Sequence, residues 1–260
     1  MDKVQKLNKF SKVLKTDFYQ SFYSKIIRRL FFVYLKFFYI IMLLVHQKEN
    51  KMKLNHPEKI SLEALLQKYQ QLKIPPYQRR YSWGVEQWKK FSDSIDEMWE
   101  FVKKDPNSND DIHYTGTIIL HVDNNKNTNI VNIVDGQQRI TTYLLLLSAF
   151  LDYCKIRINN KETGSEEEID SRIISDIRKC LFYFMGNQNY GLHDFSLNKI
   201  ELNKYDQPYY EATLRNEDKF KQTKIYKAKL YFTNWLENKH LTSSEINDLA
   251  SVILKKWMLF

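Results

Sequence analysis

The chain has 260 residues, of which 43% are hydrophobic and 15% aromatic, a composition typical of a folded protein rather than a disordered one. Its net charge of +9 is concentrated at the start, because residues 1–51 carry 11 basic and 3 acidic residues and residues 52–260 carry 29 and 28. Bulk charge beyond residue 51 therefore gives no argument for a nucleic-acid partner. The two cysteines, Cys154 and Cys180, lack any CxxC partner, which argues against a structural zinc site and a disulfide framework and favours a reducing cytosol.

The first 51 residues differ from the rest. Residues 30–45 form an apolar run that is broken by Lys36 and preceded by Arg28 and Arg29, an arrangement typical of a membrane anchor or signal sequence. Its 16 residues fall short of the roughly 20 that a spanning helix needs. An anchor, a buried or interfacial helix and a non-native extension all stay open. We favour the extension and expect the natural start at Met52.

Helical periodicity predicts two helices before residue 105. Ser61 is suited to cap a short helix over residues 62–69. A single apolar stripe predicts a long helix over residues 85–104, with its tryptophans in the core. Between the two helices the segment IPPYQRRYSW, residues 74–83, is predicted to be extended, because its Pro-Pro pair lacks backbone donors.

The second half of the chain is predicted to be mainly helical. Two β-branched runs, residues 114–122 and 128–134, predict a hairpin, and DGQQR at residues 135–139 leads into an apolar helix over residues 140–155. Residues 159–168 are a predicted solvated linker. Further helices are expected around residues 170–185, 207–215, 222–238 and 243–257, with a short strand near 199–202. The chain then runs to Phe260 without a stop signal, and we expect a truncated C-terminus.

The DGQQR segment joins a predicted strand to a helix N-terminus, where unpaired N–H groups and the helix dipole favour an anion. Gly136 allows close approach of a ligand, and Arg139 is suited to grip a phosphate with two hydrogen bonds. Gln137 and Gln138 are suited to orient a water or to read a base edge, and Asp135 to hold Mg²⁺ through water or to tie down Arg139. Taken alone, a DG turn before a helix is a common structural device, and the segment by itself favours that interpretation over a ligand site.

The extended segment offers a second set of ligand-binding groups. Amides, guanidinium groups and aromatic rings, which stack bases and bind phosphates, are concentrated at Tyr77, Gln78, Arg79, Arg80, Tyr81 and Trp83. The alternative is an edge strand whose aromatic side chains pack on the helix over residues 85–102, with Arg79 paired to Asp135.

Together these segments resemble a known family. The pattern IP-x-YQR-x-Y-x-W, then YTGTIIL with Gly116, then IVDGQQRITT is similar to the N-terminal domain of the GmrSD-type restriction endonucleases. Residues 200–214 resemble the middle region of that family, and the likeness covers roughly residues 55–240. It implies an α+β fold with a small mixed β-sheet of ParB/sulfiredoxin-like type, flanked by helices, and a helical C-terminal part. We expect the apolar and basic extension over 1–51, the ParB-like core over 52–158 and the helical part over 159–260.

The resemblance also implies a function. It predicts an NTP-binding and NTP-hydrolysing regulatory domain of a modification-dependent (type IV) DNA restriction and phage-defence system, with GTP or ATP and Mg²⁺ as cofactors. The implied catalytic residues are Asp135, Gln138 and Arg139. The implied nucleotide- and phosphate-binding residues are Tyr77, Gln78, Arg79, Gly136, Gln137, Arg139, Thr141 and Thr142. No metal-ligating residue is predicted.

The implied partners are modified DNA and an HNH-type nuclease domain or chain encoded nearby, and self-association stays open. None of the six histidines lies in a recognisable nuclease arrangement, so we expect the DNA-cutting domain to be absent and no DNA cleavage by this chain alone. The expected location is cytoplasmic, with anchoring through residues 30–45 left open. Two alternatives remain: a non-hydrolysing ParB-like DNA-binding module that uses Arg79, Arg80 and Tyr81, and an inactive product of a truncated gene.

Overall fold

The structure, a computed structural model, describes residues 58–105, 113–114, 116–122, 129–159, 169–184 and 196–259. The apolar run, the expected start at Met52, the hairpin loop and nearly all of the predicted linker lie outside these residues. In the described part no helix has the length and apolar character needed to cross a membrane.

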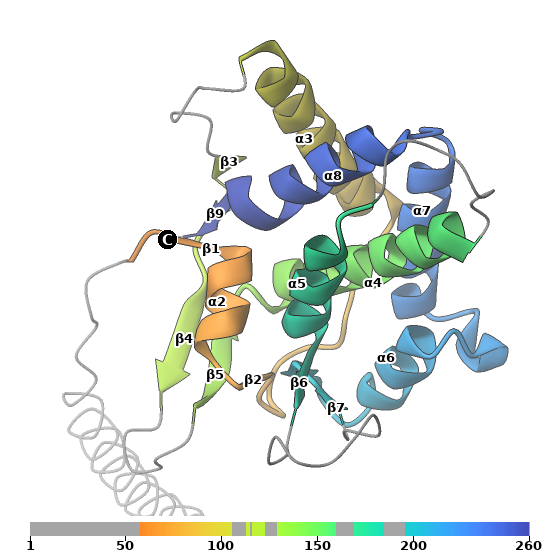
Figure 1. The fold of residues 1–260 in the computed structure, drawn as a ribbon. Helices are drawn as coiled ribbons and strands as arrows, with labels where there is room; N and C mark the ends of the chain where they lie inside the picture. The colour runs from red at the N-terminus through yellow and green to blue at the C-terminus, as the bar shows by residue number, and fades with distance from the viewer. Residues whose placement is uncertain are drawn as a thin grey trace, which may run out of the picture. The chain divides into compact units, whose positions relative to one another are not determined.

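A four-stranded mixed sheet with the order β4-β5-β2-β8 lies beside the helices (Figure 1). Strands β4 (Ile119–Val122) and β5 (Ile130–Asp135) pair antiparallel, which confirms the predicted hairpin. The short strand β2 (Gln71–Lys73) runs parallel to both β5 and β8 (Ile200–Glu201). The predicted α+β fold with a small mixed sheet is therefore confirmed, although β2 itself was not predicted.

Two smaller sheets show that some of the predicted bounds of strands and helices are wrong. In one of them, β9 (Trp257–Leu259) pairs with both β1 (Ile60–Ser61) and β3 (His113–Tyr114), so the last described strand lies between two earlier ones. The single strand predicted over 114–122 is wrong, because Gly116 has a φ of 105° and separates β3 from β4. The helix predicted over 170–185 ends at Leu181 and is followed by β6 (Phe182–Phe184), which pairs with β7 (Ser196–Asn198).

Most of the predicted helices form close to their expected bounds. Helix α2 (Leu62–Lys68) begins after Ser61, whose side chain accepts a hydrogen bond from the Ala64 N–H at 3.0 Å. Helix α3 (Val85–Lys104) has the predicted ends and buries Trp88 and Trp99. Helices α6 (Gln207–Leu214) and α7 (Lys224–Glu237) follow, with a 3₁₀ turn, η1 (Asp218–Phe220), between them. Helix α8 (Ser243–Ser251) is shorter than predicted and leads through a π-helical turn, η2 (Val252–Lys256), into β9.

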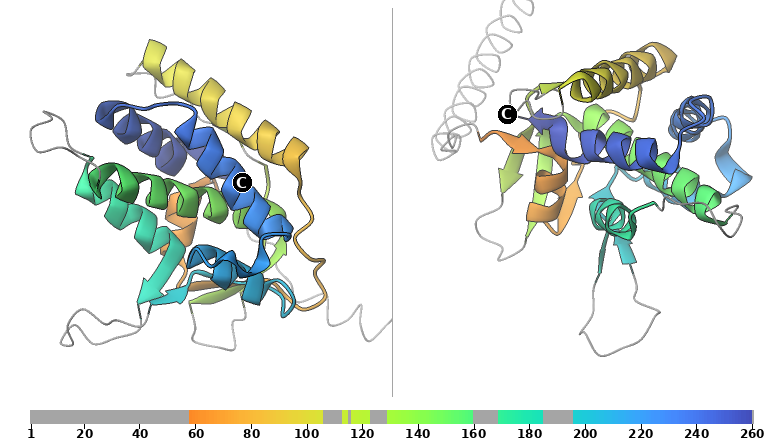
Figure 2. Two further views of the ribbon diagram at one scale, coloured as in Figure 1. Left: turned by 90° about the vertical axis from the view of Figure 1, so that its right-hand side faces the viewer. Right: turned by 45° about the horizontal axis from the view of Figure 1, so that its top comes forward.

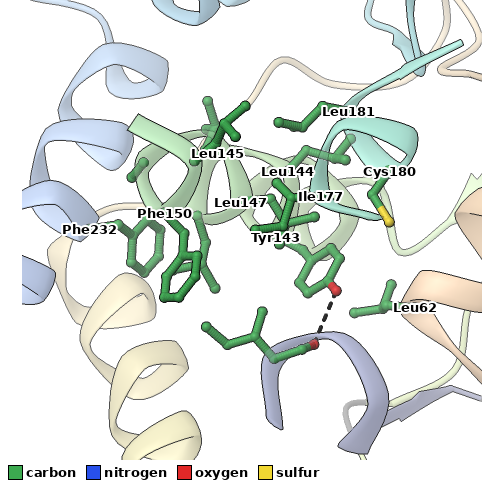
Figure 3. Packing of buried hydrophobic residues seen from close by; sticks show 14 of the residues in the cluster. Leu62, Tyr143, Leu144, Leu145, Leu147, Phe150, Ile177, Cys180, Leu181 and Phe232 are labelled. Atoms are coloured by element: carbon green, nitrogen blue, oxygen red, sulfur yellow. Dashed lines mark hydrogen bonds between the residues drawn. The ribbon is translucent and has the colours of Figure 1, made fainter. Parts of the chain in front are cut away.

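The core is organised around helix α4 (Gln137–Asn159), which packs against α7 and α5 (Ser171–Leu181) (Figure 2). Its side chains are buried on almost every face over its first four turns. The Tyr143 hydroxyl, fully buried, donates to the Ile253 carbonyl at 3.1 Å and ties α4 to η2 (Figure 3). One hydrophobic cluster extends from Leu62 to Leu254, and residues from Pro57 onward form one compact unit. Helix α4 begins at Gln137, so three residues of DGQQR belong to its first turn.

Candidate functional site

The extended segment over residues 74–83 lies directly against the start of α4. The Gln137 Nε2 atom donates to the Gln78 Oε1 atom at 3.0 Å and to the Arg79 carbonyl at 3.1 Å. Gln78 in turn donates from Nε2 to the Val134 carbonyl at 2.7 Å, just before the DGQQR residues. These bonds confirm that the two segments, 59 positions apart at Gln78 and Gln137, converge in space.

Gln138 continues this contact by one residue. Its Oε1 atom accepts from the Ser82 N–H at 2.8 Å, and its Nε2 atom donates to the Arg80 carbonyl at 3.2 Å. Gln138 is only 8% exposed. The extended segment belongs to no sheet, and the Gln138 amide gives its backbone the hydrogen bonds that a neighbouring strand would otherwise supply. The amide is therefore used on both its donor and its acceptor side, and the predicted catalytic role of Gln138 stays a prediction.

A buried chain of hydroxyl groups lies beneath this contact. The indole N–H of Trp88 donates to the Tyr81 hydroxyl at 2.8 Å, and the Tyr81 and Thr142 hydroxyl oxygens are 2.7 Å apart. Since the Tyr81 oxygen receives the indole proton, its own proton is available to Thr142. Burial raises the pKa of Tyr81 well above its ordinary value. Thr142 is fully buried and Thr141 is 2% exposed, so the structure places these two predicted ligand residues in the interior.

Asp206, just before helix α6, holds the extended segment from another element. Its Oδ2 atom accepts from the Tyr81 N–H at 2.6 Å, and its Oδ1 atom accepts from the Arg80 Nε at 2.9 Å. Asp206 is 3% exposed, and the Asn203 side-chain amide also donates to it. Sequence reasoning missed this residue. Its position before Gln-Pro suggests a helix cap, yet its side chain makes no capping bond to α6.

Two glycines interlock the hairpin with the start of α4. Arg139 donates from Nη1 to the Thr117 carbonyl at 2.8 Å, and a Cβ on Gly116 would lie 2.8 Å from that same Nη1 atom. Gly136 has a φ of 94°, and a Cβ there would lie 2.7 Å from the Cγ1 atom of Ile118. Each glycine thus leaves room for a side chain of the other segment. Gly116 was noted only as part of the family pattern, and its contact with Arg139 was not predicted.

The remaining predicted residues face solvent. Tyr77 is 76% exposed, and Arg79 and Asp135 are exposed, while Arg139 is partly exposed. In the part of the chain that the structure describes, neither Arg79 nor Arg139 forms an ion pair with Asp135. The pairing of Arg79 with Asp135, considered from the sequence, is therefore not formed. The guanidinium groups of Arg79 and Arg139 offer hydrogen-bond donors suited to phosphate oxygens, whereas Gly136, Gln137 and Gln138 at the start of α4 are buried.

The described side chains give little support for a metal ion that the protein alone would hold. Across the described residues, no group of three or more His, Cys, Asp or Glu side chains has a suitable arrangement for a metal ion. Mg²⁺ typically binds through one or two carboxylates together with substrate phosphates and water. The single exposed carboxylate of Asp135 fits such a shared site.

The comparisons with known proteins identify one family. A family model described as the GmrSD restriction endonuclease, N-terminal domain, matches residues 62–256 of this chain. That range contains the extended segment, both interlocked glycines, DGQQR and Asp206. Among curated proteins no match was found.

Proposed function

The chain belongs to the family of GmrSD restriction endonuclease N-terminal domains, part of a type IV restriction system, and from this premise we propose that it is the NTP-binding regulatory domain. It binds GTP or ATP with Mg²⁺ at the junction of β5 and α4 and hydrolyses the nucleotide. Its output is control of an HNH-type nuclease domain or chain that cuts modified DNA.

One observation carries this proposal. The Arg139 guanidinium is held by its bond to the Thr117 carbonyl and stays partly exposed, in the first turn of α4 and four residues after the exposed Asp135. A guanidinium has five N–H donors, and one nitrogen is enough to hold it in place here. A phosphate in this position would receive charge-assisted bonds from Arg139 and the positive end of the helix dipole.

The surrounding residues have separate tasks under this proposal. Gln137 and Gln138 hold the extended segment so that Arg79 and Tyr77 lie beside the start of α4. Arg79 adds a second positive charge for the phosphates, and the exposed ring of Tyr77 adds a surface for stacking. Asp135 would hold Mg²⁺, which supplies neutralisation of phosphate charge when bound.

The test is nucleotide binding by the full chain and by Arg139→Ala and Arg139→Lys, measured by isothermal titration calorimetry with GTP and ATP in the presence of Mg²⁺. Loss of a hydrogen bond to a charged group is worth about 1.5–3 kcal/mol, so Arg139→Ala should bind about 10- to 150-fold more weakly. Arg139→Lys should recover only part of the loss, because lysine keeps the charge without the planar fork.

Thermal unfolding of the same proteins separates binding from folding. Arg178, exposed on α5, is the matched control, and Arg178→Ala should leave both affinity and melting temperature unchanged. Losing the bond to Thr117 should lower the stability of Arg139→Ala by about 0.5–1.5 kcal/mol, the typical net value of a hydrogen bond. Nucleotide affinity that falls only in step with the folded fraction would contradict the proposal, as would the absence of binding by the unmodified chain.

A further inference from the structure

A row of cations and aromatic rings runs from the extended segment across α6 to η1. The Arg80 guanidinium lies 5.8 Å from the Tyr205 ring centroid and 5.6 Å from that of Tyr209. Lys204 extends the row at one end, 5.0 Å from the Tyr205 ring. At the other end the Tyr209 ring meets the Phe220 ring edge-on, with centroids 4.7 Å apart. We call these residues, together with Lys219 beside Phe220, the cation–aromatic row.

The row is built on a fixed base. Arg80 is held by the Oδ1 atom of the buried Asp206, and Asp206 also binds the Tyr81 N–H. The turn that carries Tyr205 is closed by Asn203, whose Oδ1 atom accepts from the N–H groups of both Tyr205 and Asp206 at 3.1 Å. Hydrogen bonds therefore hold the Arg80 side chain and the backbone at Tyr205, which lowers the entropy lost when a ligand binds.

The small contribution of these contacts to the stability of the fold does not explain why Arg80 and Tyr205 are exposed side by side. Tyr205 is 58% exposed and the Arg80 side chain is 57% exposed, so a large part of both faces water. A surface cation–π pair contributes only about 0.5–1 kcal/mol. The Asp206 side chain is 5% exposed and bonded to Arg80, and the exposed Asp218, next to Lys219 in η1, is paired with Lys221 at 2.7 Å. Both carboxylates are thus paired with a cation, and Lys204 and Lys219 add positive charge to the row.

We propose that the cation–aromatic row binds single-stranded DNA, with unpaired bases stacked on Tyr205 and phosphates bound by Arg80, Lys204 and Lys219. Aromatic rings spaced between cations are the combination that binds unpaired bases on a phosphodiester chain, because every base has a face to stack and every linkage a negative charge. In a duplex those base faces are already stacked on one another. The row is distinct from the junction proposed for the nucleotide, and it extends the family's action on DNA to a specific surface and strand state.

The test is fluorescence anisotropy of a labelled single-stranded oligonucleotide and of a duplex of the same length, titrated with the full chain without nucleotide. The chain should bind the single strand more tightly. Tyr205→Ala should weaken that binding about 5- to 150-fold, the loss expected for one stacked base, while Tyr205→Phe should retain it. Phe101, which is 52% exposed near the far end of α3, is the matched control, and Phe101→Ala should bind as the unmodified chain does.

Salt dependence tests the cations separately. Three neutralised phosphates predict a slope of about −2 for log K against log salt on a single strand, and Lys204→Ala should reduce its magnitude by about 0.7. Nucleotide affinity of Tyr205→Ala should be unchanged, so the row and the nucleotide site succeed or fail independently. Equal affinity for duplex and single strand, unchanged binding by Tyr205→Ala, or no binding by the unmodified chain would each overturn the proposal.

Discussion

Replacing Gly136 with alanine tests the interlock between the hairpin and helix α4. The new Cβ would lie 2.7 Å from Ile118 Cγ1, and the φ of 94° is one that side chains rarely adopt. The backbone contribution is about 1–2 kcal/mol, the penalty of a left-handed conformation for a residue with a Cβ. Crowding adds about 1–3 kcal/mol, and reduced freedom of the unfolded chain returns about 0.4–1 kcal/mol. We expect a net loss of about 1–4.5 kcal/mol in the free energy of unfolding.

A double-mutant cycle separates the two contributions. Ile118→Ala removes the Cγ1 atom and relieves the crowding, but it leaves the backbone strain at position 136. The cycle of Gly136→Ala and Ile118→Ala should therefore show a favourable coupling of about 1–3 kcal/mol, measured by urea unfolding of all four proteins. The packing lost by Ile118→Ala itself cancels in the cycle.

Gly84 provides the matched control, because a Cβ there has its nearest neighbour at 3.8 Å and the φ is −134°. Gly84→Ala should therefore lose less than about 1 kcal/mol, the size of a helix-cap effect. A stability of Gly136→Ala within about 0.5 kcal/mol of the unmodified chain would refute the reasoning. Strictly additive effects in the cycle would refute the steric part alone.

Two further predictions concern buried polar groups. Gln138→Ala leaves the Ser82 N–H and the Arg80 carbonyl unpaired. It should therefore lower the free energy of unfolding by about 1–3 kcal/mol, measured in a thermal melt. Lost NTP hydrolysis at unchanged stability would instead support the catalytic role predicted from the sequence. Burial raises the pKa of the Cys154 and Cys180 thiols to about 12, so at pH 8 both should react with a thiol reagent roughly a thousandfold more slowly than a free cysteine. Two reactive thiols should appear only on unfolding, and rapid labelling of the native chain would show that the helices around them open.

The elements that the sequence predicted are those with a strong local pattern. Helix α3 has a polar face and an apolar face over 20 residues, and its predicted ends match the structure. The hairpin of β4 and β5 followed from two β-branched runs close together in the chain. Strand β2 has only three residues and was missed, because its place between β5 and β8 depends on pairing with residues 59 and 128 positions away.

The sequence predicted that the two segments meet, but not the contacts between them. The two segments were expected to meet, since each carried groups suited to one ligand. Which of those groups are used to hold the segments together was not visible, because Gln137 and Gln138 find their partners more than 50 positions earlier. Asp206, 125 positions from Tyr81, carries no local signal for its role. The same residue types are suited to bind a ligand and to hold two segments of the chain together. Only the three-dimensional contacts show which of the two roles a residue has.

The reciprocal fit of Gly116 to Arg139 and of Gly136 to Ile118 has a consequence for recombination between relatives. A graft that exchanges only the hairpin would import a residue at 116 or 118 shaped for another helix start, and a graft of the helix start alone would do the reverse. Crossover points between residues 116 and 139 should therefore yield poorly folded hybrids. Exchanging the whole stretch keeps both pairs together, which makes it the smallest transferable unit of this junction.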